Sequence, residues 1–276
     1  MSEPAIQVDD IYKSFGTLRV LDGVSLTVNV GETVAILGRS GTGKSVLLKT
    51  IIALLDPDKG EVKVFGTNLH KLDEHARLKA RSGIGYVFQG AALFDSLTVM
   101  ENVGFQLFQQ RIPLDEIRQQ VLDRLTMVGL DEAIDKVPSE LSGGMQKRVG
   151  LARAIIGHPR LILYDEPTTG LDPLTTDVIN RIILRLRRKL GVSSVVVTHD
   201  MRTAFTVADR IIMLDQGRII AEGSPEQIER SENAWVQQFI SGRVSDADPS
   251  IAHLSKQKIL PASLIQPPRQ DRDNDL

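Results

Sequence analysis

The chain has 276 residues, of which 42% are hydrophobic and 25% charged, a composition ordinary for a globular protein with a sizeable core. Its formal net charge of -2 excludes a general basic surplus of the kind that draws proteins to nucleic acid. The lack of cysteine excludes disulfides and cysteine-based metal sites, and every apolar run is far shorter than the roughly 20 residues of a membrane-spanning helix.

The N-terminal region is predicted to form β-structure that leads into a phosphate site. Apolar residues recur between residues 6 and 11 and alternate between residues 26 and 30, which predicts strands of an antiparallel β portion. Residues 34–37 form a continuous apolar run typical of a strand buried on both faces. Glycines follow at once and residues 45–55 have helical character, so the order of strand, glycine loop and helix predicts a phosphate-binding unit.

The middle of the chain combines buried strands with helices. Apolar runs recur at residues 84–88, 161–164 and 195–197 with helical stretches between them, which favours a mostly parallel sheet covered by helices. Residues 90–158 lack a clear buried strand, and their pattern is helical, most clearly at residues 114–128. We therefore expect an inserted helical subdomain over about residues 90–158.

The later elements are a long helix and a hairpin. Asp172 can cap the helix, Pro173 suits its first position, and Gly191 follows its end. Residues 210–214 and 218–221 flank a Gln-Gly pair, which predicts a hairpin. The expected buried stripe of the helix consists of Val178, Ile179, Ile182, Ile183, Leu186 and Leu190.

The composition becomes polar and proline-bearing after Gly242. We therefore expect one domain over residues 1–241 and a C-terminal tail over residues 242–276. Composition favours a disordered tail, whereas apolar residues between 259 and 265 favour docking on a partner subunit.

Residues 38–45 read Gly-Arg-Ser-Gly-Thr-Gly-Lys-Ser, which matches the P-loop pattern in full. Glycines let backbone N–H groups turn inward around an anion, and the following helix adds its positive N-terminal end. Lys44 is expected to reach the β- and γ-phosphates, and the Ser45 hydroxyl to ligate Mg²⁺. The strand before the loop and the helix after it disfavour a plain glycine turn. The expected ATP-binding residues here are Gly38, Arg39, Ser40, Gly41, Thr42, Gly43, Lys44, Ser45 and Val46.

The apolar run at residues 161–164 ends in two carboxylates, Asp165 and Glu166. Ligands of open α/β folds sit at the carboxyl edge of the sheet, where these residues are placed. Asp165 is expected to hold Mg²⁺, directly or through water, and Glu166 to polarise the attacking water. Acidic residues at a strand end are often merely solvated, so this pair alone does not indicate a site. Its combination with the P-loop does.

Residues 141–146 read Leu-Ser-Gly-Gly-Met-Gln. Ser142 is a good helix cap, and two glycines leave the helix N-terminus open to an anion. Alone, this would be a plain capped helix. With the P-loop, the chain has two phosphate cradles, and two subunits placed head to tail could grip one triphosphate with both.

These motifs resemble those of the ABC-type ATPases, and the resemblance extends from about residue 6 to about residue 242. It implies a P-loop NTPase with a RecA-like α/β core, an N-terminal antiparallel β portion and an inserted helical subdomain. It further implies that two copies sandwich two molecules of ATP with Mg²⁺. Residues 1–241 are then the ABC ATPase domain.

The same resemblance implies roles for residues outside the P-loop. Gln89 is similar to the Q-loop glutamine, His199 to the switch histidine, and Phe15 to an aromatic residue that stacks on adenine. Asp172, in Gly170-Leu171-Asp172, resembles the D-loop aspartate. The implied catalytic set is Lys44, Gln89, Glu166 and His199; the implied metal ligands are Ser45, Gln89 and Asp165; the implied contribution of the second subunit is Ser142, Gly143, Gly144 and Gln146.

Finer details resemble one branch of the family. Arg39, Val46, residues 88–94 and Met145 are unlike typical sugar or amino-acid importers and similar to the ATPases of the Mla and Mce systems, which move phospholipids or other lipids across the bacterial envelope. Members of that branch often read Ser-Gly-Ala-Leu-Phe after the glutamine, and Gly90-Ala91 departs slightly from this.

The resemblance to this branch implies transport of lipid, with phospholipid the expected class, through a separate integral-membrane permease. The implied further partners are an MCE-domain substrate-binding protein and a small accessory protein, at the cytoplasmic face of the inner membrane. Two alternatives remain open: an importer ATPase for a small polar solute, and a soluble ABC ATPase acting on ribosomes or DNA. One cassette, no coiled-coil or zinc insertion and no basic surplus disfavour the latter.

Overall fold

The computed structural model of the chain describes residues 3–110 and 112–242. The chain divides into two units, residues 1–231 and residues 232–276. Within the second unit, helix α9 (Ala234–Ser241) stacks the rings of Trp235 and Phe239 at 5.3 Å. This helix lies before the expected domain boundary at residue 241 and within the second unit. The expected docking segment at residues 259–265 lies outside the described residues.

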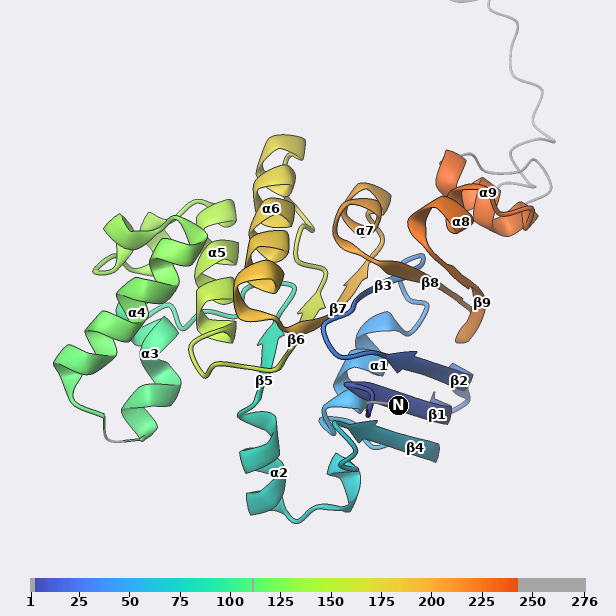
Figure 1. Cartoon of the computed structure of the whole chain (residues 1–276), viewed down its shortest axis with the longest axis horizontal. Helices are drawn as coiled ribbons and strands as arrows, with labels where there is room; N and C mark the ends of the chain where they lie inside the picture. Colours follow the sequence, from blue (N-terminus) through green and yellow to red (C-terminus); the bar gives the residue numbers. More distant parts are fainter. Residues whose placement is uncertain (1–2, 111, 243–276) are drawn as a thin grey trace, which may run out of the picture. The chain divides into compact units, whose positions relative to one another are not determined.

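A six-stranded sheet forms the centre of the first unit, in the order β5-β6-β7-β3-β8-β9 (Figure 1). All pairs from β5 to β8 are parallel, and β8 and β9 form the predicted antiparallel hairpin. Every residue of β3, β6 and β7 is buried, as their continuous apolar runs predicted. The strands are β3 (Thr33–Leu37), β5 (Ile84–Val87), β6 (Leu161–Asp165), β7 (Ser193–Thr198), β8 (Arg210–Asp215) and β9 (Arg218–Gly223).

A second, antiparallel sheet has the order β2-β1-β4 and contains β1 (Ile6–Phe15), β2 (Leu18–Val28) and β4 (Lys59–Val64). The sequence predicted β1 and the end of β2, and missed β4 and the first half of β2. These missed parts have few buried side chains. In β4 only Val62 and Val64 are buried, and the charged residues beside them are exposed or half-buried. Packing against β1, rather than local pattern, makes them strands.

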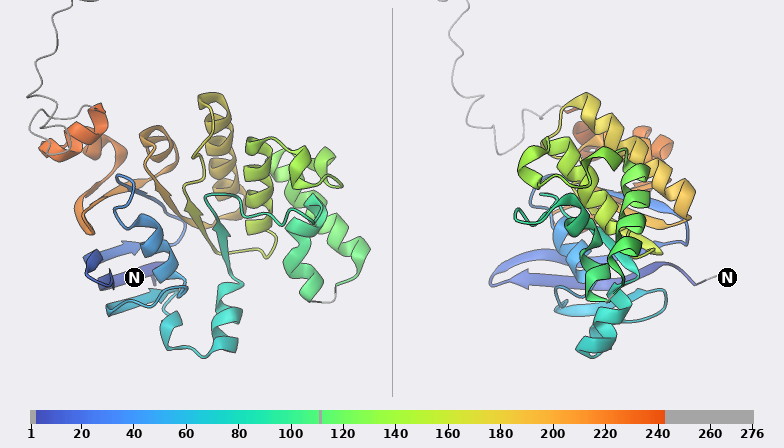
Figure 2. Two further views of the ribbon diagram at one scale, coloured as in Figure 1. Left: turned by 180° about the vertical axis from the view of Figure 1, so that it is seen from behind. Right: turned by 90° about the vertical axis from the view of Figure 1, so that its left-hand side faces the viewer.

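Helices cover both faces of the central sheet. Figure 2 shows α3, α4 and α5 grouped at one end of it and the antiparallel sheet with α1 at the other. The former group falls within the helical subdomain expected at residues 90–158. The helices of the first unit are α1 (Lys44–Ile51), α2 (Glu74–Arg81), α3 (Val99–Gln109), α4 (Leu114–Val128), α5 (Gly143–Ala154), α6 (Pro173–Leu190), α7 (Met201–Val207) and α8 (Pro225–Glu229).

Alternate residues of the strands feed two separate cores. Ile162 and Tyr164 of β6 face a core shared with α3, α4, α5 and α6, whereas Leu161 and Leu163 face a core shared with α1 and the antiparallel sheet. The sheet therefore holds the P-loop helix on one side and the helical subdomain on the other.

Helix α6 has the predicted ends. The Asp172 carboxylate accepts the N–H groups of Leu174 and Thr175 at 2.9 and 3.0 Å, and Gly191 ends the helix with φ +63°. The predicted stripe was wrong at Val178, which is 43% exposed. Val178 lies one position before Ile179, and only the latter faces the sheet; both are apolar, so composition did not separate them.

Asn102 of α3 is fully buried and bonds the loop that precedes its own helix. Its Oδ1 accepts the N–H of Phe94 at 2.8 Å, and its Nδ2 lies 3.0–3.1 Å from the carbonyl oxygens of Phe94, Leu97 and Thr98. One amide thus satisfies four backbone groups of a loop that has no other regular structure.

We predict that Asn102→Ala lowers the free energy of unfolding by about 2 kcal/mol, because it removes a fully buried amide and leaves the Phe94 N–H and the Leu97 carbonyl group without this partner. Urea unfolding followed by circular dichroism measures this. The matched control is Gln109→Ala at the exposed end of α3, which should stay within about 0.5 kcal/mol of the wild type. Equal midpoints for the two variants would show that the loop does not depend on Asn102.

Candidate functional site

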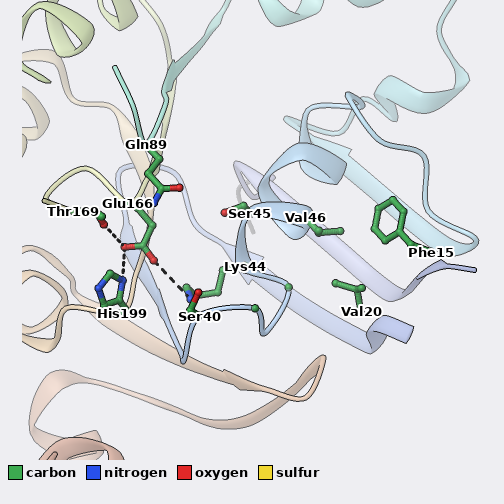
Figure 3. Close-up of a pocket in the computed structure, with 12 residues that line it drawn as sticks. Phe15, Val20, Ser40, Lys44, Ser45, Val46, Gln89, Glu166, Thr169 and His199 are labelled. Atoms are coloured by element: carbon green, nitrogen blue, oxygen red, sulfur yellow. Dashed lines mark hydrogen bonds and ion pairs between the residues drawn. The ribbon is translucent and has the colours of Figure 1, made fainter. Parts of the chain in front are cut away.

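A cavity of about 580 Å³ lies at the edge of the sheet where β3 leads into the P-loop and where β6 and β7 end. Its lining residues come from widely separated parts of the sequence (Figure 3). Parallel strands bring their carboxyl ends to one edge, so residues that follow β3, β6 and β7 meet there. The cavity is lined by Phe15, Val20, Ser40, Gly41, Gly43, Lys44, Ser45, Val46, Gln89, Glu166, Thr169 and His199. Ten of the sequence-predicted site residues are therefore together.

The P-loop has the form of a cradle for an anion. Gly41 has φ +81° and open space where a Cβ would stand. Gly43 has φ +99°, and a Cβ there would lie 2.7 Å from the Val20 carbonyl oxygen. Gly43 is also the N-cap of α1, and having no side chain it leaves the first N–H groups of the helix to a ligand. These features fit a phosphate chain.

Lys44 is 5% exposed and curls back over its own loop. Its Nζ donates to the carbonyl oxygens of Gly38 and Arg39 at 2.9 and 2.8 Å, and lies 3.7 Å from Glu166 Oε1. Burial lowers the pKa of Lys44, and the negative charge of Glu166 opposes that shift. The ammonium group is thus held at the cavity by neutral carbonyls, with its charge only partly balanced by Glu166.

The expected metal ligands supply hard oxygen atoms. Ser45 Oγ donates to Asp165 Oδ1 at 2.6 Å, and Gln89 lines the same side of the cavity. Hydroxyl, carboxylate and amide oxygens suit Mg²⁺, which keeps several waters and takes few protein ligands. This donor set fits the expected ion.

Tyr86 braces the carboxylate of this set and was not predicted. Its hydroxyl donates to Asp165 Oδ2 at 3.0 Å. Burial raises the pKa of Tyr86, and the charge of Asp165 adds to the shift, so the phenol stays a donor. The partners stand 79 residues apart in sequence, and only the parallel pairing of β5 with β6 brings them together.

Glu166 is held in one orientation by its neighbours. His199 Nδ1 lies 2.8 Å and Thr169 Oγ1 3.0 Å from Glu166 Oε2, while Oε1 faces Lys44 (Figure 3). The residue is 7% exposed and has φ +51°, a left-handed backbone that its N–H bond to the Val197 carbonyl at 2.9 Å helps to hold. A carboxylate fixed in this way can orient a water molecule and accept its proton.

Apolar residues occupy the far end of the cavity. Phe15, Val20 and Val46 lie together there, away from Glu166 (Figure 3). Phe15 is 48% exposed, which suits a ring that stacks on a flat ligand. Val20, which lies in the missed part of β2, was not predicted.

Residues 142–146, whose implied role is in the site of the second subunit, lie elsewhere, at the start of α5. Ser142 caps the helix by accepting the N–H of Met145 at 3.3 Å. A Cβ on Gly143 would meet open space, whereas one on Gly144 would lie 2.5 Å from Thr175 Cγ2, so only the former glycine leaves the helix end open. Gln146 turns inward and donates to the Pro138 carbonyl at 3.0 Å.

The remaining predicted residues have local structural partners. Thr42 Oγ1 donates to the Arg39 carbonyl at 2.9 Å and closes the P-loop. Arg39 lines a neighbouring cavity of about 520 Å³ with Ser40 and Gly41. The Asp172 carboxylate caps α6.

Among the described residues, no helix is long and apolar enough to cross a bilayer.

Comparisons with known proteins agree with this geometry. The ABC transporter family model matches residues 21–169. The chain is 42% identical over 258 residues to the chloroplastic protein TRIGALACTOSYLDIACYLGLYCEROL 3 of Arabidopsis thaliana, covering 87% of this chain and 74% of that protein. It is 38% identical to the probable ribonucleotide transport ATP-binding protein mkl of Mycobacterium tuberculosis (87% and 67% covered) and 35% identical to the spermidine/putrescine import ATP-binding protein PotA of Haemophilus influenzae (95% and 69%).

Solved structures are similar as well. One is an ATP-binding cassette dimer in a post-hydrolysis state bound to ADP and Pi, with a TM-score of 0.74, 35% identity, and 80% of this chain and 98% of that chain covered. Another is cbiO1 from Clostridium perfringens, part of the ABC transporter complex cbiONQ, with a TM-score of 0.77, 27% identity, and 93% and 100% covered.

We predict that Tyr86→Phe reduces the affinity for Mg²⁺, measured as the Mg²⁺ dependence of nucleotide binding, by about 10-fold, because Asp165 loses the group that orients it. Tyr12→Phe on β1, outside the cavity, is the matched control. A Tyr86→Phe titration that overlays the control would show that the phenol plays no part in metal binding.

Proposed function

The chain belongs to the ATP-binding subunits of ABC transporters, and we propose that it energises the transport of lipid, of the phospholipid class, across the bacterial envelope. As a member of this family it binds ATP with Mg²⁺ and hydrolyses ATP in a reaction coupled to transport. The lipid is the part of the proposal that goes beyond the family.

The observation that carries the lipid proposal is the similarity to the Arabidopsis protein, whose name contains a galactolipid, at 42% identity. The residues that resemble the Mla and Mce ATPases, among them Met145 and residues 88–94, support the same class. An importer for a polar solute is the second candidate, because the chain is 35% identical over 95% of its length to a protein named for spermidine and putrescine import. Membership in a transporter family gives no support to action on ribosomes or DNA.

We assign the chemistry of the site to residues fixed before the ligand arrives. The P-loop N–H groups and Lys44 hold the phosphates, and Phe15 stacks on adenine. Ser45, Asp165 and Gln89 would hold Mg²⁺, which would supply positive charge for the oxygens of the transferred phosphoryl group. Glu166 orients the attacking water and accepts its proton, and His199 keeps the Glu166 carboxylate in place.

A second copy of the chain completes the site. Residues 142–144 start α5 and do not line the cavity of their own chain, although Gly143 leaves that helix end open. In the similar solved cassette the assembly is a dimer. We therefore propose that residues 142–144 of each copy, with Asp172 close by, face the nucleotide of the other.

Exposed aromatic residues offer a surface for the permease. Phe88, Phe94 and Phe105 are 38%, 47% and 39% exposed, and the rings of Phe94 and Phe105 lie 5.0 Å apart. Exposed apolar groups in one region mark partner surfaces. We propose that a helix of the permease docks there, at the cytoplasmic face of the inner membrane, and that an MCE-domain protein and a small accessory protein complete the complex.

We predict that Glu166→Gln binds ATP normally but hydrolyses it at least about 100-fold more slowly, because the phosphate cradle is intact and the group that accepts the proton from water is lost. The variant should also form an ATP-dependent dimer that outlasts that of the wild type in sedimentation. Lys44→Ala is the contrast: calorimetry should show weakened nucleotide binding itself. Near-normal hydrolysis by Glu166→Gln would remove Glu166 from the mechanism.

The transported class is tested on the complex. We expect mass spectrometry of the complex, purified through a tag on this chain, to show phospholipid enriched over an unrelated membrane complex in the same detergent. Proteoliposomes with that complex should move a labelled phospholipid only when ATP is present and Glu166 is intact. Enrichment of a polyamine or another polar solute, with lipid at the level of the control, would instead support the importer.

A further inference from the structure

The strand that carries Phe15, β1, runs on beyond its pairing with β4. That pairing extends from Ile6 to Tyr12, and Phe15 stands three residues after its last pair. On its other edge β1 pairs with β2 as far as Phe15, but the register shifts after Lys13. Phe15 is 48% exposed, so packing alone does not hold its ring. The end of β1 therefore depends on further bonds to keep the ring in place.

Asp58, which directly precedes β4, supplies such bonds. Its N–H donates to the carbonyl oxygen of Tyr12 at 2.8 Å, and its Oδ2 accepts the N–H of Ser14 at 2.6 Å. Its Oδ1 accepts a hydrogen bond from Lys13 Nζ at 3.0 Å. The bond from Lys13, followed by the bond from Ser14, lowers the pKa of Asp58, so this carboxylate keeps its charge. One residue thus binds three consecutive residues of β1 just before Phe15.

Lys13 also contacts the ring of Phe15. Its Nζ lies over the ring, 5.5 Å from the ring centroid, a distance at which the negative face of an aromatic ring attracts a cation. The side chain of Lys13 is only 16% exposed, and its ammonium group is held by Asp58. Lys13 is not among the residues that line the cavity. The cation therefore holds the ring without taking the place of a ligand.

The loop that carries Asp58 is attached to the phosphate end of the site. It follows α1, the helix that begins at the P-loop, and it ends where β4 begins. The Arg81 guanidinium donates to the carbonyl oxygen of Ile52 at 2.8 Å and also to that of Ala53. These bonds fix the loop just after the helix. The position of the ring relative to the phosphate cradle is therefore set by one short stretch of chain.

We propose that Asp58 and Lys13 are positioning residues for the base of the nucleotide. They hold the ring of Phe15 where adenine can stack on it while the phosphates lie in the P-loop. Neither residue lines the cavity, and both act through the ring. This inference rests on the proposed stacking of adenine on Phe15.

The simpler alternative is that Asp58 and Lys13 only join β1 to β4 and stabilise the fold. Variants of Lys13 separate the two roles. Lys13→Met removes the cation and keeps the stem, whereas Lys13→Arg keeps a cation that can lie over the ring. Lys63→Met is the matched control, because it removes a lysine of the same sheet that pairs with Glu61 instead.

The probes are ADP and inorganic pyrophosphate, each with Mg²⁺, because they share a diphosphate and differ in the nucleoside. Calorimetry with the full-length protein measures both affinities. We expect Lys13→Met to lose about threefold in ADP affinity, and Asp58→Ala at least as much, with pyrophosphate affinity unchanged. Lys13→Arg and Lys63→Met should bind ADP like the wild type. In a Phe15→Ala background Lys13→Met should cause no further loss, because the ring through which it acts is gone.

Three outcomes would overturn the proposal. The first is a Lys13→Met protein that binds ADP like the wild type. The second is an equal loss for ADP and pyrophosphate, and the third is a loss that persists in full in the Phe15→Ala background; both would mean that the residues act on the fold alone. If Asp58→Ala does not fold, the Lys13 variants carry the measurement. A wild type that binds pyrophosphate as tightly as ADP would instead refute the stacking role of Phe15.

Discussion

Strands β3, β6 and β7 are buried on both faces, so charged groups of this part of the fold stand where the strands end. Glu166 and His199 directly follow β6 and β7, and Lys44 follows β3 at the end of the P-loop. At that edge Lys44 and Glu166 are buried and lie 3.7 Å apart, and the exposed His199 bonds to Glu166. Burial of the sheet thus concentrates these polar groups at one edge, and the cavity and the expected metal ligands both depend on it.

In the free protein the positive charge of Lys44 is incompletely paired, and an anionic ligand would complete the pairing. Lys44 is held by two carbonyl groups and lies 3.7 Å from Glu166, farther than a hydrogen-bonded ion pair. A closer pair would give a more stable site but would engage the cation that phosphate needs. The buried ammonium group, whose pKa is lowered by burial, gains most when an anion enters the cradle beside it. The incomplete pairing of Lys44 therefore favours binding.

The sequence predicted the parts of the site that local chemistry determines. The P-loop, the carboxylates at the end of β6 and the caps of α6 each need particular residue types at fixed short spacings, so they can be predicted from the local sequence. Tyr86 was missed because its partner Asp165 is distant in sequence, and Thr169 was missed because a threonine three residues after a glutamate is no distinctive pattern. Val178 was misassigned and β4 was overlooked because tertiary packing determines which residues are buried and which segments pair as strands. The periodicity of the sequence only approximates that packing.

Within one chain, the residues around Glu166 are already held in place, whereas the proposed contribution of residues 142–144 requires a second copy. Glu166 is already oriented by His199 and Thr169, and its left-handed backbone is held by the bond to Val197, so hydrolysis need not await a rearrangement of the carboxylate. The open start of α5, at Gly143, does not line this cavity. In the proposed dimer, residues 142–144 of the second copy supply the contacts to the nucleotide that this cavity lacks, so turnover depends on assembly of two copies as well as on Glu166.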